Sequence, residues 1–331
     1  MKYMYVLFLC LIFAFNSSLA VEGASKKSVN LILDTDLGPD YDDVGAMTVL
    51  HALADSGQVH ILATISSNHH EAVVPCIEVL NTYFGRADIP VGAPKSAGGV
   101  NQTDGHKIKW TEVLPAKYPH HTLRTSDAPD AVKVYRKILS NAPNKSVTIC
   151  STGFLTNLRD LLTSGPDEYS RLSGKELVAK KVRRLVSMAG MFPSGREYNV
   201  YCDAPAGAAV INEWPTEIIF SGFEIGEKIR TGKSVATMDV DNSPVKEVFK
   251  LCLAEDGMQG RMSWDQTAVL VAIKGVDPYF TVERGQCSVA ADGSNTWKAG
   301  KEGSHLRLIQ KMGIPEITGV IETLMRHQPS K

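Results

Sequence analysis

The sequence has few cysteines and no pair of them at short spacing. Six cysteines occur among 331 residues, and no CxxC pattern is present. This argues against a structural zinc site and against a dithiol redox motif. Cys10 lies in a predicted leader, and the other five are Cys76, Cys150, Cys202, Cys252 and Cys287. We interpret these as mainly core thiols. One disulfide stays open, because sequence alone cannot choose a pair.

The sequence also lacks an excess of charge of either sign. It has 35 Lys and Arg against 36 Asp and Glu, a net charge of -1. There is therefore no electrostatic case for a nucleic-acid partner or an anionic membrane.

One apolar run stands near the N-terminus, over residues 6–15, and it is too short to span a bilayer. Lys2 precedes this run and Ser18-Leu19-Ala20 follows it. Together they predict a secretory signal peptide over residues 1–20, with cleavage near 20–24. We therefore expect a secreted protein, or a periplasmic or vacuolar one if the host provides that compartment, with no membrane contact after removal of the leader.

Two nucleotide-binding motifs are missing: no GxGxxG follows the first strand, and no GxxxxGK[ST] occurs. Dinucleotide and P-loop readings therefore lack support. Strand patterns at 29–33, 60–65, 146–150, 182–188 and 217–220 alternate with helical patterns. This predicts a single α/β domain over residues 25–331, with an open, mostly parallel, Rossmann-like sheet and helices on both faces. Helices are expected at 71–84, 128–139, 244–254, 264–274 and 314–326, short strands near 279–290 and 304–309, and a long loop over 93–127.

The sequence does contain a dense run of carboxylates directly after the first strand. The five acids are Asp34, Asp36, Asp40, Asp42 and Asp43. Charges this close repel one another unless a cation or ligand neutralises them, so the run predicts a metal and polyol site. The alternative is that Asp42 and Asp43 only favour a helix N-terminus, which is worth about 0.3–1 kcal/mol.

Other polar clusters also follow predicted strands, at 66–68, 151–153 and 189–199. In parallel α/β sheets, ligands bind outside the carboxyl ends of the strands. We therefore expect all these clusters to converge at one sheet edge.

Taken together and in order, these segments resemble the inosine-uridine-preferring nucleoside hydrolases over roughly residues 29–270. The resemblance is carried by the acidic run, Ser66-Ser67-Asn68, Ser151-Thr152-Gly153 with Leu155-Thr156-Asn157-Leu158, Glu197-Tyr198-Asn199, and Trp264-Asp265-Gln266-Thr267-Ala268. It implies a nucleoside hydrolase fold, a bound Ca²⁺ and a small-molecule nucleoside substrate. The implied reaction is hydrolysis of the N-glycosidic bond of ribonucleosides to free base and ribose. Whether the chain forms a homo-oligomer stays open.

By position in these motifs, the resemblance implies a catalytic role and a calcium site. Asp36 would be both the general base and a calcium ligand. The implied further ligands are Asp43, Asp265 and the main-chain carbonyl of Thr152.

The resemblance also implies the contacts to substrate. Asp42 and Asn199 would bind the ribose 2'- and 3'-hydroxyls, and Glu197 the 5'-hydroxyl. Asn68 is expected beside the substrate or, with Asp34, as a support for the ligands. For Asp203 we expect a helix cap in place of a ligand contact.

Two departures from the family pattern bear on the leaving base. Pro39-Asp40-Tyr41 intervenes before the Asp pair, which leaves Asp40 without a role. Trp264 stands where many relatives have the histidine that serves as acid for the base, as in the purine-specific inosine-adenosine-guanosine branch. Its ring can stack on a purine, so we expect a purine-leaning enzyme; the alternative is a core tryptophan. His106 and Trp110, in the predicted loop, are further candidates to close over the base.

Two other function classes stay open at this point. The missing histidine favours a non-catalytic calcium and ribose-binding protein of the same fold. A haloacid-dehalogenase-type phosphatase would explain Asp34-Thr35-Asp36 after a strand, but Gly38 stands where that motif usually has Thr or Val.

Overall fold

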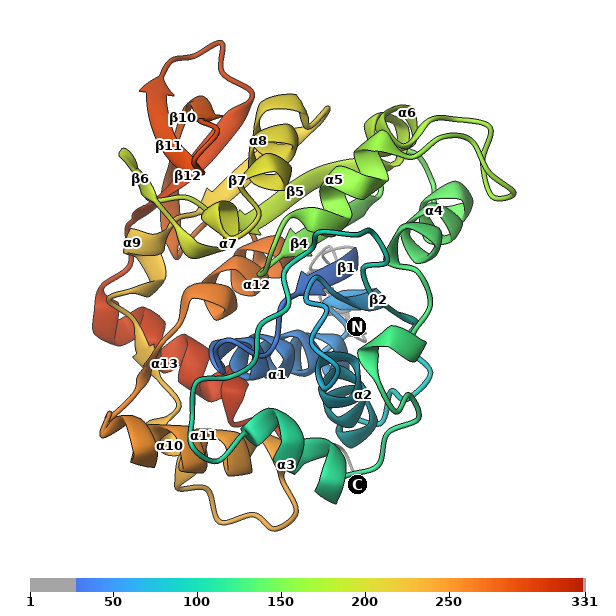
Figure 1. Ribbon diagram of the computed structural model, residues 1–331. Coiled ribbons are helices and arrows are strands. Elements are labelled where there is room, and N and C mark those ends of the chain that lie inside the picture. The colour runs from blue at the N-terminus through green and yellow to red at the C-terminus, as the bar shows by residue number, and fades with distance from the viewer. Residues whose placement is uncertain (1–27, 330–331) are drawn as a thin grey trace, which may run out of the picture.

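The computed structural model describes residues 28–329, and a ten-stranded sheet runs through its centre. The strand order is β3-β2-β1-β4-β5-β7-β12-β10-β11-β6 (Figure 1). Strands β3 to β12 in this order are parallel, whereas β10, β11 and β6 join antiparallel at one end. The strands are β1 (Val29–Thr35), β2 (Val59–Ser66), β3 (Val91–Gly92), β4 (Val147–Ser151), β5 (Val182–Met188), β6 (Ser194–Arg196), β7 (Glu217–Ser221), β10 (Phe280–Val289), β11 (Ser294–Ala299) and β12 (His305–Gln310).

Helices cover both faces of this sheet, and a two-stranded ribbon of β8 (Arg230–Thr231) and β9 (Arg261–Met262) lies apart from it. The helices are α1 (Asp42–Asp55), α2 (Val73–Tyr83), α3 (Trp110–Lys117), α4 (Ala131–Asn141), α5 (Thr156–Thr163), α6 (Gly174–Lys181), α7 (Tyr198–Tyr201), α8 (Ala204–Glu213), α9 (Phe223–Gly226), α10 (Lys233–Ala236), α11 (Pro244–Asp256), α12 (Trp264–Lys274) and α13 (Ile314–Met325), with a 3-10 turn at Thr125–Asp127.

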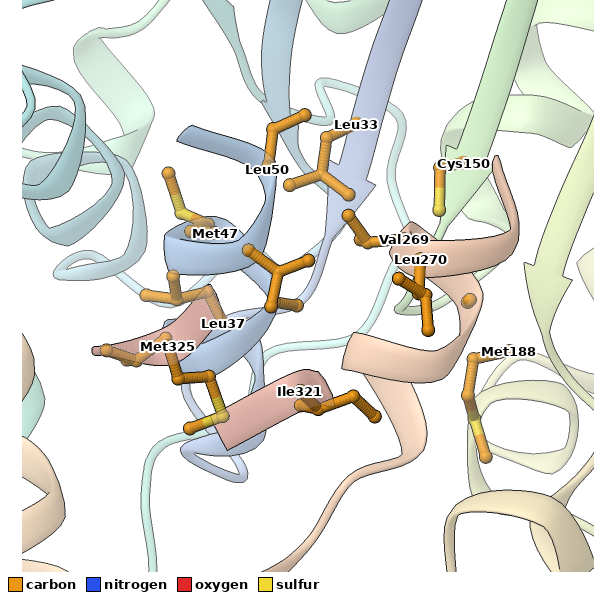
Figure 2. Packing of buried hydrophobic residues seen from close by; sticks show 14 of the residues in the cluster. Leu33, Leu37, Met47, Leu50, Cys150, Met188, Val269, Leu270, Ile321 and Met325 are labelled. Atoms are coloured by element: carbon orange, nitrogen blue, oxygen red, sulfur yellow. The ribbon is translucent and has the colours of Figure 1, made fainter. Parts of the chain in front are cut away.

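The central strands are apolar on both faces because each face carries its own core. In β1, Leu31 and Leu33 join the core formed with α1, α2, α11, α12 and α13, whereas Ile32 joins the core formed with α4, α5, α6 and α8. Figure 2 shows part of the first core, where Leu33 of β1 and Val269 of α12 lie among side chains of α1 and α13. Period-two alternation therefore orients every strand, and the rigid sheet fixes where its ends lie.

The predicted α/β fold is confirmed, but the long loop over residues 93–127 is wrong in part. That segment contains α3, whose Trp110, Thr111 and Leu114 are buried, and the 3-10 turn. The sequence did not predict this two-turn helix, because the segment is rich in polar residues and contains Pro115. The apolar side of the helix faces α2. The sequence patterns also missed α6 and β11.

All five cysteines of the described residues are free thiols, so the open disulfide does not form in this structure. The predicted signal peptide, residues 1–20, lies outside the described residues. Among the helices of residues 28–329, none is long and apolar enough to cross a membrane.

Candidate active site

The predicted polar clusters meet at the carboxyl edge of the parallel strands, as strand order requires. Asp36 follows β1, Thr152 follows β4, and Glu197 and Asn199 follow β5. Two helix N-termini complete the edge, those of α1 and α12. These segments line one cavity of about 340 Å³. Its walls are formed by Asp36, Pro39, Asp40, Asp42, Asp43, Thr152, Met188, Glu197, Tyr198, Asn199, Phe223, Arg261, Trp264 and Asp265.

Three buried carboxylates that line the cavity lie close together. Asp42, Asp43 and Asp265 each place one carboxylate oxygen within 4.8 Å of the others. They meet because α1 and α12 pack closely: a Cβ at Gly45 would lie 2.4 Å from Nε2 of Gln266. The backbone N–H of Asp265 also donates to Oδ2 of Asp42 at 3.2 Å. All three acids lie in the first turn of a helix, where the dipole favours negative charge.

The surroundings of this trio oppose its negative charge. Burial raises the pKa of Asp43 to about 6. Burial and then the charge of Asp43 raise the pKa of Asp42, and burial and then the charge of Asp42 raise that of Asp265. Hydroxyl donors Thr35 and Thr152 on Asp43 offset this only in part. A hard divalent cation with oxygen ligands would neutralise the cluster, so these residues fit a calcium-type ion.

Asp36 lies in the same cavity, beside this trio. Burial, and then the charges of Asp43 and Asp42, raise its pKa well above the ordinary range. Its backbone is held by the turn after β4: a Cβ at Gly153 would lie 2.3 Å from the nitrogen of Asp36. Only glycine allows that approach, which gives the Thr-Gly turn a physical reason. The three acids that lie within reach of one another therefore include Asp42 and do not include Asp36. That Asp36 is a metal ligand stays a prediction.

Asp34 and Asn68 occupy supporting positions outside the cavity wall. Asp34 is fully buried and accepts hydrogen bonds from Tyr135 (2.8 Å) and Asn157 (3.1 Å). Burial raises the pKa of Asp34 to about 7. Asn68 donates to the carbonyl of Asp36 at 3.0 Å and to that of Gln102 at 2.8 Å, and its Oδ1 accepts from the Gln102 N–H at 3.1 Å. The Asn68 amide therefore fixes the acidic loop and ties the 99–109 segment to it.

Glu197 and Asn199 also line the cavity and contact each other. The Glu197 carboxylate accepts from the N–H groups of Asn199 (2.8 Å) and Gly190 (3.1 Å), and burial raises its pKa to about 7. Asn199 Nδ2 donates to the carbonyl of Met188 at 3.1 Å and to that of Thr152 at 3.4 Å. Its Oδ1 has no hydrogen-bond partner within residues 28–329.

Aromatic side chains also line the cavity. Trp264 is half-buried, and its ring lies 5.1 Å from that of Phe223 at an interplanar angle of 31°. The Trp264 Nε1–H donates to the carbonyl of Phe223 at 2.8 Å. The indole is thus held by its edge, lines the cavity and is not a fully enclosed core tryptophan. That it stacks on the base stays a prediction.

The structure shows a partner for Asp40. It also excludes one of the two residues that were expected to close over the leaving nucleobase. Asp40 forms an ion pair with Arg261, and both line the cavity. Trp110 is fully buried in the core, so it cannot close over a base. His106 instead contacts Asp256 at 3.2 Å and the edge of Tyr41. Asp203 caps α8 by accepting from the N–H of Ala206 at 3.2 Å, which confirms its expected role.

Sequence reasoning missed Arg261, Phe223 and Tyr198 as cavity residues. The available signal for Arg261 was a basic residue three positions before Trp264, next to an acidic loop whose Asp40 had no role.

A cluster of buried carboxylates at the carboxyl edge of an open α/β sheet is consistent with a metal site. The family model described as inosine-uridine preferring nucleoside hydrolase matches residues 31–312. The chain therefore belongs to the inosine-uridine nucleoside hydrolase family.

Curated relatives are distant. An uncharacterised protein from Schizosaccharomyces pombe is 28% identical over 228 residues, which cover 64% of this chain and 66% of that protein. The pyrimidine-specific ribonucleoside hydrolase RihA of Escherichia coli is 26% identical over 215 residues, 60% of this chain and 61% of the relative. The chain thus spans just under two thirds of the length of these relatives.

Solved structures share the fold along nearly their whole length. An inosine-guanosine nucleoside hydrolase superposes with a TM-score of 0.67 at 20% identity, covering 90% of this chain and 99% of that chain. A purine-preferring ribonucleoside hydrolase from Gardnerella vaginalis gives a TM-score of 0.66 at 16% identity, with the same coverage. At these identities the likeness concerns the fold.

Proposed function

We propose that this protein is a calcium-dependent, purine-leaning nucleoside hydrolase that releases a free base and ribose. The observation that carries the proposal is the convergence of Asp36, Asp42, Asp43 and Asp265 in one cavity that the Trp264 side chain also lines. Family membership supports the reaction class. The choice between purines and pyrimidines rests on Trp264, because relatives of both kinds occur.

The proposed chemistry begins with a water molecule on the sugar side of the bond. Breaking the C1'–N bond builds oxocarbenium character on the ribose, and Asp36 would take the proton of the attacking water. The chemistry that a bound calcium supplies is Lewis acidity, which lowers the pKa of water, and attraction for hydroxyl oxygens.

The ribose would be held by three residues that line the cavity, namely Asp42, Glu197 and Asn199. Nδ2 of Asn199 donates to two carbonyls, which fixes the orientation of the amide. Oδ1 of the same amide can then accept a hydrogen bond from a ribose hydroxyl. Asp42 would accept from the 2'- or 3'-hydroxyl. Glu197 would meet the 5'-hydroxyl while its backbone donors hold its carboxylate in place.

We also propose that the protein is secreted, because the sequence predicts a leader over residues 1–20. A homo-oligomer stays open.

Replacing Asp36 by Asn tests the assignment of the base. The amide keeps the shape and removes the base, so inosine hydrolysis should fall by about 10²–10⁴-fold. Free ribose is measured with calcium present. The matched control is Asp203→Asn, a buried carboxylate outside the cavity whose capping role Asn can keep.

The proposal fails if wild-type protein releases no ribose from inosine, adenosine, guanosine or uridine. Calorimetric binding of ribose without turnover would favour the non-catalytic calcium and ribose-binding protein instead.

A further inference from the structure

Among the residues of 28–329 that line the cavity, Arg261 is the only basic side chain, and six carboxylates line the same cavity. Its guanidinium carbon lies 5.4 Å from the centre of the Trp264 ring and 5.3 Å from that of Tyr41. Arg261 therefore lies beside two aromatic rings, one of which, that of Trp264, also lines the cavity.

The surroundings of Arg261 hold it rigidly. Asp40 pairs with its Nη2, and Oδ1 of Asp40 accepts the Tyr41 N–H at 2.6 Å. Tyr41 is itself 1% exposed, and its hydroxyl donates to Asp256 at 2.8 Å. The guanidinium is thus preorganised, and little side-chain entropy remains to be lost when it binds a ligand.

One donor of this guanidinium is left over. Nε of Arg261 is buried and meets no acceptor within residues 28–329. A buried N–H without a partner costs about 1–3 kcal/mol. The Arg261 side chain lines the cavity, and its guanidinium lies beside two aromatic rings, a position that suits a planar ligand with acceptor atoms at its edge.

We infer that Arg261 recognises the leaving base, donating a hydrogen bond to it and stabilising the negative charge that it gains. This rests on the proposed function. Trp264 has no useful proton to give, so the base side of the bond otherwise lacks polar assistance. A fixed guanidinium aimed at developing negative charge gives electrostatic stabilisation of the transition state.

The step balances without proton transfer from Arg261. The C1'–N bond breaks, and its electron pair stays on the base, which departs as an anion beside the guanidinium. Water oxygen bonds to C1' and gives its proton to Asp36. Solvent then protonates the base, and Asp36 returns its proton to solvent.

The experiment compares two leaving groups. Arg261→Met and Arg261→Gln are assayed with inosine and with p-nitrophenyl β-D-ribofuranoside, whose nitrophenolate leaves without assistance. Loss of one such donor should lower kcat/KM for inosine by about 10²-fold, while the nitrophenyl riboside changes by less than about 3-fold. Arg124→Met is the control, because Arg124 pairs with Asp127 at the surface, and both substrates should be unaffected.

The outcomes separate this inference from the proposed function. An equal loss on both substrates, or no loss on inosine, would overturn the recognition of the base by Arg261 while wild-type turnover keeps the proposed function. Wild-type protein that hydrolyses neither substrate overturns the proposed function. Calorimetry with hypoxanthine then decides: weaker binding by Arg261→Gln retains base recognition, and equal binding rejects it.

Discussion

At the scale of single residues, the site is a set of carboxylates held where carboxylates are costly. Asp42, Asp43 and Asp265 are at most 4% exposed and lie within reach of one another. Helix N-termini and hydroxyl donors reduce the cost without removing it. A chain that retains such a cluster gains stability when a cation binds, because binding to the folded state alone shifts the folding equilibrium.

Replacing Asp265 by Asn separates the charge from the shape. Without metal the variant should unfold at the same temperature as wild-type protein or higher, because one repelling carboxylate is gone. Calcium at 100 times its Kd should stabilise wild-type protein by about 2.7 kcal/mol and the variant far less. Thermal unfolding with calcium and with a chelator measures both effects.

Asp203→Asn serves as the comparison, and its calcium response should match wild-type protein. If Asp265→Asn kept the full calcium-induced shift, the metal site would have to be placed elsewhere.

At the scale of elements, α1 carries both site residues and core. Its first turn holds Asp42 and Asp43, while His51 near its other end is fully buried. His51 lies 3.1 Å from Asn81 Oδ1 through Nε2, and its other nitrogen faces Arg86 at 3.5 Å. Burial, and then the charge of Arg86, lower the pKa of His51 to about 3. The folded protein therefore keeps this histidine neutral.

This predicts a pH dependence of stability with a definite sign. The folded pKa lies below the unfolded value of 6.5, so the contribution of His51 is present above pH 6.5 and is lost as pH falls toward 3. The slope is at most about 1.4 kcal/mol per pH unit. His51→Gln, which can still donate to Asn81, should lose less stability than wild-type protein between pH 6.5 and 4.5 in urea unfolding.

His60→Gln is the matched control, because His60 is exposed; its pH dependence should follow wild-type protein. Identical slopes for His51→Gln and wild-type protein would show that His51 is not the titrating group.

The elements that were predictable are those with a simple local signal. The strand at 29–33 and the helix at 264–274 follow from local pattern. Helix α3 was not predicted from the sequence, because its buried face is short and is defined only by packing on α2. Arg261 escaped for a similar reason, since its partner Asp40 lies 221 residues away in sequence.

For the site itself, parallel-sheet topology was enough to predict convergence of the acidic run with Thr152 and Asp265. It could not decide which acids form the compact trio, because the separation between Asp42 and Asp265 depends on how closely α1 approaches α12 at Gly45.

At the scale of the whole molecule, two cores pack against the parallel strands, one on each face, and the acidic cavity lies at their carboxyl edge. The relatives show that one fold accommodates pyrimidine-specific and purine-preferring enzymes. We propose that base specificity resides in the residues that line the cavity, here Trp264, Phe223 and Arg261.

The central claim is calcium-dependent cleavage of a nucleoside, and ribose release from inosine tests it most directly. Purified protein is incubated with calcium, with a chelator, and with calcium restored. We predict equal amounts of ribose and hypoxanthine with calcium, loss of both with chelator, recovery when calcium returns, and slower release from uridine. Absence of ribose from every common nucleoside with calcium present would contradict the account.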